Sequence, residues 1–233
     1  MRSFNEYDVH SVTMKRKQKD SLPEIYSTLY EHYGDLHWWP AKTPYEVIVG
    51  AILTQNTAWS NVEKAIEQFG DDISPERVRS MPIEELQQII RPAGFYKQKS
   101  LYLKAITDWY ASYNCDTEFV KGRTLSELRR ELLKVHGVGN ETADSILLYG
   151  FDLPTFVVDA YTMRLFNRFP VDAGENYLQV KEYCEALLPK DPLIYNRCHA
   201  LIVMHCKDYC KKKPLCMGCP LEDRCKSSNQ IKL

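Results

Sequence analysis

The sequence has no run of about eighteen apolar residues, the length that a membrane-spanning helix needs. The first twenty residues are mostly polar and hold no apolar stretch of the kind found in a signal peptide. An internal repeat, a low-complexity linker and a long block of like charge are also absent. We therefore expect a soluble, intracellular, cytoplasmic protein that acts as a monomer and has no membrane partner.

An excess of charge of either sign is missing too, because 30 basic and 31 acidic residues leave a formal charge of −1 at pH 7. The chain as a whole therefore has no attraction for nucleic acid, and any phosphate binding has to come from local clusters. One such cluster is Lys211, Lys212 and Lys213, for which a solvated surface is the alternative interpretation.

Strict alternation of apolar and polar residues is nearly absent, whereas apolar residues recur at helical spacing along the chain. Two capping-box patterns, Thr43 with Glu46 and Thr124 with Glu127, indicate helix starts. The sequence predicts an all-α fold of roughly ten or eleven helices of ordinary length. One strand-like run, residues 155–159, is too short and isolated to imply a sheet.

The joint "HGVG" at residues 136–139 separates two amphipathic helical patterns. Glycine tolerates a positive φ and has no side chain, so Gly137 and Gly139 permit a tight reversal and a close approach to the backbone. The amides at the start of the second helix then point outward and can bind an anion such as a phosphate. A purely structural helix hairpin is the alternative.

Cysteine is concentrated at the end of the chain. An intracellular chain keeps its thiols reduced, so disulfides are not expected. Four of the eight cysteines have the spacing C-x5-C-x2-C-x5-C, namely Cys210, Cys216, Cys219 and Cys225. Four thiolates this close can hold either a 4Fe-4S cluster or a structural zinc ion, and the spacing alone leaves both open.

Two segments, "VHGVGNETADSILLYG" and "PTFVVDAYTMRLFNRF", closely resemble the helix-hairpin-helix DNA glycosylase superfamily, which includes endonuclease III. The resemblance covers roughly residues 23–225. It implies a two-lobed all-α fold with a helical barrel domain at 38–151, which carries the hairpin. A second helical lobe, 1–37 and 152–233, holds the cysteine loop, and double-stranded DNA binds between the lobes.

The resemblance also implies the roles of several residues. Asp159 becomes the active-site carboxylate, with a helix N-cap as the alternative role. Gln55, in "TQNT", fills the space left by an extruded base, unless backbone groups satisfy it inside the protein. The hairpin grips the DNA backbone, and the basic cluster near the end of the chain contacts phosphates. These DNA-binding residues are Gln55, His136, Gly137, Val138, Gly139, Lys211, Lys212 and Lys213.

The same resemblance favours a 4Fe-4S cluster over zinc, with Cys210, Cys216, Cys219 and Cys225 as ligands. The first gap is five residues where the family usually has six, so Cys206 is an alternative first ligand.

The chemistry follows from one position in the hairpin. Members of the superfamily that cleave the strand carry a lysine two residues after the second glycine, where this chain has Glu141. A carboxylate cannot form a Schiff base, so we expect a monofunctional enzyme. Asp159 then stabilises the developing oxocarbenium ion and orients or deprotonates a water molecule.

The base pocket resembles that of the 3-methyladenine DNA glycosylase branch. The stretches "WWP" and "TQNTAW" suggest Trp38, Trp39 and Trp59 as pocket residues, with core packing as the alternative. Gly50 stands where adenine-excising relatives carry a glutamate. The alkyl-specific relatives often lack the cysteine loop, so the chain combines features of two branches.

These features together predict a base-excision-repair N-glycosylase for an alkylated base of the 3-methyladenine type. One alternative is an endonuclease III-like enzyme for oxidised pyrimidines, with weak strand scission by Lys97 or Lys99. Another, of a different class, is a non-catalytic DNA-binding iron-sulfur protein.

Overall fold

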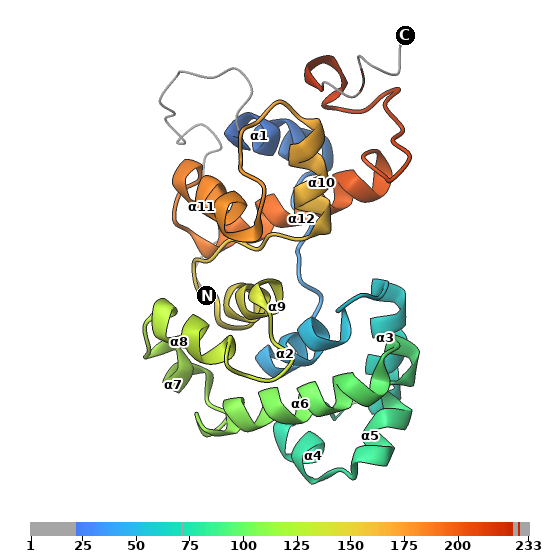
Figure 1. Ribbon diagram of the computed structural model, residues 1–233, viewed down its shortest axis with the longest axis vertical. Coiled ribbons are helices and arrows are strands. Elements are labelled where there is room, and N and C mark those ends of the chain that lie inside the picture. The colour runs from blue at the N-terminus through green and yellow to red at the C-terminus, as the bar shows by residue number, and fades with distance from the viewer. Residues whose placement is uncertain (1–21, 71, 226–227, 229–233) are drawn as a thin grey trace. The chain divides into compact units, whose positions relative to one another are not determined.

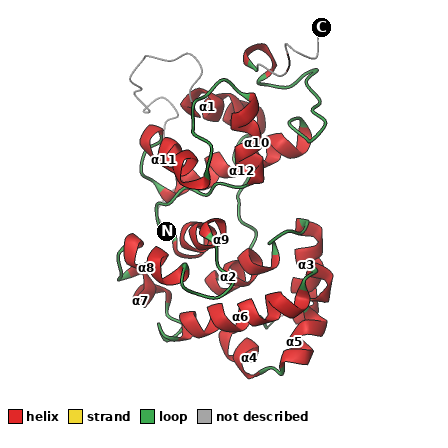
Figure 2. Cartoon of the chain, in the orientation of Figure 1, coloured by secondary structure: helices red, strands yellow, loops and turns green. Residues whose placement is uncertain are grey.

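The computed structural model describes residues 22–70, 72–225 and 228 of the chain. In these residues the structure consists of helices and loops, and no β-strand is present (Figure 2). The prediction of an all-α fold is therefore confirmed. Residues 155–159, the strand-like run, form an extended connection that pairs with no other strand in the described chain. The described residues form twelve α-helices, slightly more than expected, because short segments such as α4 and α7 are separate helices.

The chain divides into two compact units, which we describe separately (Figure 1). The first unit, residues 38–157, holds eight of the α-helices, a 3-10 turn η2 and a π-helical segment η3 that continues α9. Their bounds are α2 (Pro44–Leu53), α3 (Trp59–Phe69), α4 (Pro75–Ser80), α5 (Ile83–Ile89), η2 (Arg91–Ala93), α6 (Tyr96–Ala111), α7 (Thr117–Lys121), α8 (Leu125–Leu132), α9 (Asn140–Ser145) and η3 (Ile146–Gly150).

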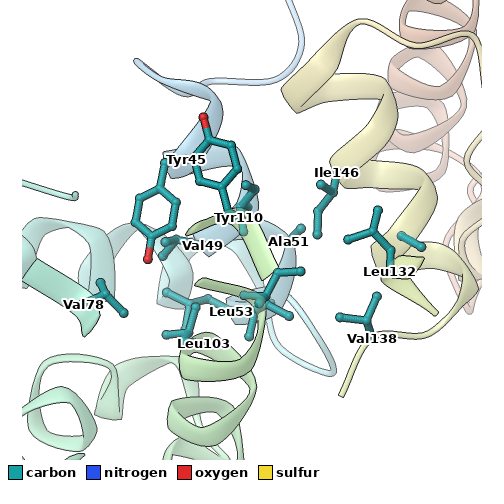
Figure 3. Packing of buried hydrophobic residues seen from close by; sticks show 14 of the residues in the cluster. Tyr45, Val49, Ala51, Leu53, Val78, Leu103, Tyr110, Leu132, Val138 and Ile146 are labelled. Carbon is teal, nitrogen blue, oxygen red and sulfur yellow. The ribbon is translucent and has the colours of Figure 1, made fainter. Parts of the chain in front are cut away.

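The core of the first unit is built around α2. Every residue from 45 to 53 is buried, because α3, α6, α9 and η3 pack against α2. Figure 3 shows Leu53 of α2 beside Leu103 of α6, and Ala51 of α2 on the side of Ile146 of η3. Thr43 starts this helix, since its hydroxyl accepts a hydrogen bond from the Glu46 N–H at 3.1 Å. Burial of this apolar surface is the main stabilising contribution to the unit.

The second unit contains the described residues up to 37 and from 158 onward. Its longest helix, α12, packs against α1 and α10, and α1 also packs against α11. The bounds are α1 (Leu22–Tyr33), α10 (Ala160–Arg168), α11 (Tyr177–Leu187), α12 (Pro192–Asp208) and the 3-10 turn η4 (Glu222–Arg224). Side-chain caps begin three of these helices: Asp159 for α10, Asn176 for α11 and Asp191 for α12. None of the helices in the described ranges is long and apolar enough to cross a membrane.

Candidate active site

The joint between α8 and α9 contains the two glycines, and Gly137 is fixed by the protein itself. Its φ is +86°, and a Cβ placed there would lie 2.1 Å from Cγ of Tyr102. The Tyr102 ring packs edge-on against His136, with ring centroids 4.9 Å apart. An L-residue at this position would be strained in its backbone and would also collide with the tyrosine.

Gly139 has a different environment. It is the N-cap of α9 with φ −97° and ψ −175°, a conformation open to any residue. A Cβ at this position would meet no protein atom within 4 Å. Between the two glycines, Val138 is only 8% exposed and packs into the core, while His136 and Gly139 are exposed. The fold therefore needs a bare backbone at Gly137 and leaves open space at Gly139.

Gln55, in the turn after α2, ties this turn to the hairpin. Its Nε2 donates to the carbonyl oxygen of Gly137 at 2.9 Å and to Oγ1 of Thr142 at 3.0 Å. Both amide hydrogens are therefore used inside the protein, and the side chain is half-buried. This contact places Gln55 directly behind the exposed face of the joint.

A buried ion pair holds the second helix of the hairpin and was not anticipated from the sequence. Arg129 of α8 donates from Nε to Oδ1 of Asp144 at 2.9 Å and from its NH2 nitrogen to Oδ2 at 3.0 Å. The same guanidinium contacts Asn140 Oδ1, and Thr155 Oγ1 donates to Asp144 Oδ1 at 2.7 Å. Because the Asp144 carboxylate is fully buried, this pair fixes the orientation of α9.

The three tryptophans suggested for the base pocket lie together in the first unit. Trp39 is edge-on to Trp59 with centroids 4.9 Å apart, and edge-on to Trp38 at 6.1 Å. Its ring stacks on Tyr149 of η3 at 5.0 Å, with 29° between the planes. We call Trp38, Trp39, Trp59 and Tyr149 the aromatic group; all four are half-buried. Tyr149 was missed because it lies outside the apolar rhythm of the second hairpin helix and meets Trp39 only through packing.

Gly50 on α2 makes room for this arrangement. A Cβ at position 50 would lie 3.4 Å from Cζ2 of Trp39 and 3.5 Å from its Nε1. The absence of a side chain at Gly50 therefore allows the Trp39 ring to lie against the surface of α2. A side chain larger than alanine would occupy the volume that the indole now fills.

Asp159, in the second unit, acts as the N-cap of α10. Its Oδ1 accepts hydrogen bonds from the Thr162 N–H at 2.7 Å and from the Thr162 hydroxyl at 2.9 Å. Its Oδ2 lies 3.5 Å from Nε2 of His199 on α12, and 12% of the side chain is exposed. Burial opposes ionisation, but the charge and contact of His199 and the two Thr162 donors outweigh it and hold the pKa of Asp159 below its usual range. His199 was not anticipated from the sequence.

The four cysteines of the C-x5-C-x2-C-x5-C pattern line one small cavity of about 20 Å³. Cys206 is buried beside Cys210 and is not among the residues that line this cavity. The Cys206 thiol and the Arg168 guanidinium, which lies 3.3 Å from the Cys210 sulfur, lower the pKa of Cys210. The thiols of the described chain do not converge as tightly as a single metal ion requires. Arg168 also donates to the carbonyl oxygens of Lys211 and Lys212, so the loop has a protein framework of its own.

Comparison with known proteins assigns the chain to a family. The model of the HhH-GPD superfamily of base excision DNA repair proteins matches residues 49–190, which is more than half of the chain and includes the hairpin, Gln55 and Asp159. The chain belongs to this superfamily. It is accordingly a DNA glycosylase, and the resemblance found in the sequence is confirmed.

Among related sequences, "Putative DNA repair glycosylase MJ1434" of Methanocaldococcus jannaschii is 48% identical over 219 residues, which cover 92% of this chain and 100% of that protein. Among solved structures, endonuclease III in a non-covalent complex with DNA superposes with a TM-score of 0.75 at 21% identity, over 90% of this chain and 96% of that one. This similarity confirms the fold. The Helicobacter pylori 3-methyladenine DNA glycosylase MagIII, bound to 1,N6-ethenoadenine, gives a TM-score of 0.69 at 26% identity, over 81% and 97% of the two chains.

In this HhH-GPD glycosylase the lysines considered as nucleophiles differ in access. Glu141, the residue that the sequence resemblance places at the lysine position of strand-cleaving members, is exposed on the first turn of α9. Lys97 is exposed, whereas Lys99 is 2% exposed and donates to the carbonyl oxygens of Leu53 and Ala93, both at 2.8 Å. Burial lowers the pKa of Lys99 to about 8. Because its amine is bound by two carbonyl groups, Lys99 has a structural role in this arrangement.

Two further surface features of the glycosylase lie on loops. The side chains of Lys211, Lys212 and Lys213 are exposed on the cysteine loop, next to exposed Leu215. Phe95 was missed by sequence reasoning: it is 63% exposed, with φ +48° at the start of α6. Only the glycine before it, Gly94, marks the sharp corner that exposes this ring.

Proposed function

We propose that this glycosylase removes an alkylated base of the 3-methyladenine type from double-stranded DNA by hydrolysis of the N-glycosidic bond. The observation that carries the proposal is the aromatic group at Gly50, where Trp39 stacks on Tyr149 and meets Trp59 edge-on. The similarity to the H. pylori 3-methyladenine DNA glycosylase also supports it.

The chemistry of the base fits aromatic side chains. Methylation at N3 leaves adenine with a positive charge, which an indole face attracts by about 0.5–2 kcal/mol more than it attracts a neutral ring. The same charge weakens the glycosidic bond, so the pocket needs no strong acid to protonate the leaving base. Gly50 agrees with this requirement, because it offers no acidic side chain to the aromatic group.

Asp159 is the proposed catalytic carboxylate. Its pKa below the usual range keeps it ionised at neutral pH, as the stabilisation of an oxocarbenium-like sugar requires. Water attacks the anomeric carbon, the bond to the base breaks, and the proton of the water passes to the carboxylate or to solvent. Since Glu141 replaces the hairpin lysine, the reaction ends with an abasic site and an intact strand.

DNA binding is proposed for the hairpin and for the lysines of the cysteine loop. The open space at Gly139 lets a phosphate approach the amides at the start of α9. The lysine side chains at 211–213 add contacts that weaken as salt rises. Gln55 is proposed to fill the space left by the extruded base, which would require it to exchange its present hydrogen bonds for contacts to DNA.

We further propose that Cys210, Cys216, Cys219 and Cys225 hold a 4Fe-4S cluster. Four thiols that line one site without converging on a single point suit a group of several atoms, whereas zinc draws its four sulfurs to about 2.3 Å from one point. The lowered pKa of Cys210 favours the thiolate that a ligand must be. Such a group would stabilise the loop and take no part in base removal. Iron and sulfide analysis, with visible absorbance from thiolate-to-iron charge transfer, distinguishes it from colourless zinc.

The test is a base-release panel. Purified protein is incubated in excess over duplexes that contain 3-methyladenine, thymine glycol, uracil or a T:G mismatch, and released bases are identified by mass. We expect release of 3-methyladenine, no strand break, and loss of the activity in Asp159→Asn. Release of oxidised pyrimidines alone would refute the alkyl-base assignment. An Asp159→Asn protein as active as the parent would refute the mechanism.

A second candidate is an endonuclease III-like activity on oxidised pyrimidines. It is favoured by the superposition on endonuclease III and by the cysteine loop. In that case thymine glycol is the released base, and strand scission depends on Lys97. If no base is released from any duplex although DNA binds, the protein is a DNA-binding member without catalysis.

A further inference from the structure

The two oxygens of the Asp159 carboxylate have different surroundings. Oδ1 is held by the backbone and hydroxyl of Thr162 on α10, as an N-cap. Oδ2 faces the imidazole of His199, which belongs to α12 and is 5% exposed. Residue 199 is 40 positions further along the chain, so this contact depends on the packing of α10 against α12.

The arrangement constrains the carboxylate in two ways. The Thr162 contacts fix Oδ1, and the imidazole at 3.5 Å limits rotation of the Oδ2 side of the group. Among the described residues, His199 and Thr162 are the groups that favour the ionised carboxylate against the effect of burial. Two other ionisable groups interact electrostatically in this region. The charge of Asp159 raises the pKa of Cys206 on α12, and the charge of Arg164 on α10 lowers it.

We propose that His199 is a positioning residue for Asp159: its imidazole on α12, 3.5 Å from Oδ2, holds the carboxylate in the orientation that base removal needs. This role rests on the proposed function, because it presupposes that Asp159 acts on the sugar. Thr162 could maintain the helix cap without His199, so the α10 cap and the positioning of Oδ2 are separable. The imidazole is too deeply buried to take part in DNA binding itself.

The test compares His199→Phe, which keeps a ring but has no donor, with His199→Gln, which keeps a neutral N–H donor. Single-turnover rates are measured at saturating 3-methyladenine duplex, and affinity is measured with a duplex carrying a stable abasic analogue. We expect a rate loss of about 10- to 100-fold in the Phe variant, partial recovery in the Gln variant, and affinity within about twofold of the parent.

The dependence of the single-turnover rate on pH distinguishes positioning of Asp159 from a purely structural role of His199. His199 lowers the pKa of Asp159, so its removal raises that pKa, and the acidic limb of the rate profile moves to higher pH. The Gln variant restores a donor but not the electrostatic interaction of the imidazole with the carboxylate, so its limb remains shifted. Cys198→Ala is the control, because it removes a buried side chain of α12 that is not among the groups acting on Asp159.

Parental rates and an unshifted limb in the Gln variant would overturn the inference, even if the Phe variant failed to fold. Such a result leaves the proposed function standing as long as Asp159→Asn is inactive. A fully active Asp159→Asn protein would instead remove the basis of both.

Discussion

Replacing each hairpin glycine by alanine should distinguish what the joint needs for folding from what it needs for DNA binding. At Gly137 an L-residue at φ +86° costs about 1–2 kcal/mol. The collision of its Cβ with the Tyr102 ring adds about 1–3 kcal/mol. We therefore expect Gly137→Ala to lower the free energy of unfolding by about 2–5 kcal/mol.

Gly139→Ala should leave stability nearly unchanged and weaken DNA binding instead. The new Cβ meets no protein atom within 4 Å, and the backbone is already in an extended conformation. Alanine is a poorer N-cap by up to about 1 kcal/mol, but it reduces the freedom of the unfolded chain by about 0.4–1 kcal/mol. The two effects nearly cancel, so stability should change little. DNA affinity should fall about 10- to 150-fold, since hydrogen bonds to a charged phosphate contribute about 1.5–3 kcal/mol.

The assays are urea unfolding followed by circular dichroism, and fluorescence anisotropy with a labelled abasic-analogue duplex at two salt concentrations. A Tyr102→Ala background serves as the control, because it removes the ring against which the Gly137→Ala methyl collides. In that background Gly137→Ala should cost about 1–3 kcal/mol less. If Gly139→Ala binds DNA as tightly as the parent at both salts, no phosphate approaches the joint, and the hairpin is only structural.

Four further predictions can be checked with single variants. Glu141→Lys should place an amine on the exposed first turn of α9, so borohydride should trap a covalent DNA adduct that the parent does not form. A variant that releases the base but forms no adduct would contradict the assignment of position 141 as the Schiff-base position. Gly50→Leu should displace Trp39 and lower the rate of 3-methyladenine release at least about tenfold. Gly50→Ala, whose Cβ would lie 3.4 Å from the indole, should release the base at nearly the parental rate. Equal rates in the parent and both variants would exclude Trp39 from the pocket. Lys99 has a pKa of about 8 in the folded protein and about 10.4 in the unfolded chain, so between these pH values the unfolded chain binds more protons. The free energy of unfolding of the parent, relative to that of Lys99→Met, should therefore rise by about 2 kcal/mol from about pH 7.5 to about pH 9.5. A difference in urea unfolding that stays constant with pH would contradict the lowered pKa of Lys99. Cys216→Ser should lose iron and weaken DNA binding more than it slows single turnover at saturating DNA; full iron content would remove Cys216 from the ligand set.

The sequence predicted correctly those features that depend on residues close together in the chain. Periodicity and caps predicted the all-α fold, and the caps at Thr43, Thr124 and Asp159 are present in the structure. The hairpin and the run before Asp159 carried the family resemblance, which the family comparison confirms. Each of these signals lies within a few turns of chain, where residue spacing alone specifies geometry.

The contacts that sequence reasoning missed join distant segments. Arg129 meets Asp144, and Asp159 meets His199, only after helices have packed. The ring of Tyr149 stacks on Trp39, a residue more than a hundred positions earlier in the chain, and no local pattern indicates this contact. For Gly137 and Gly139 the pattern was the same in sequence, and only the position of Tyr102 shows that the protein itself fills the space at one of them.

The cap that Asp159 provides for α10 also bears on how this enzyme could change. Asparagine caps a helix about as well as aspartate, so replacing one oxygen by an amide nitrogen at this position preserves the helix start while removing the charge. If Asp159 has the proposed catalytic role, a folded protein that still recognises lesions but no longer cleaves the glycosidic bond is a single substitution away. Evolution from repair enzyme to damage sensor would need no reorganisation of the scaffold.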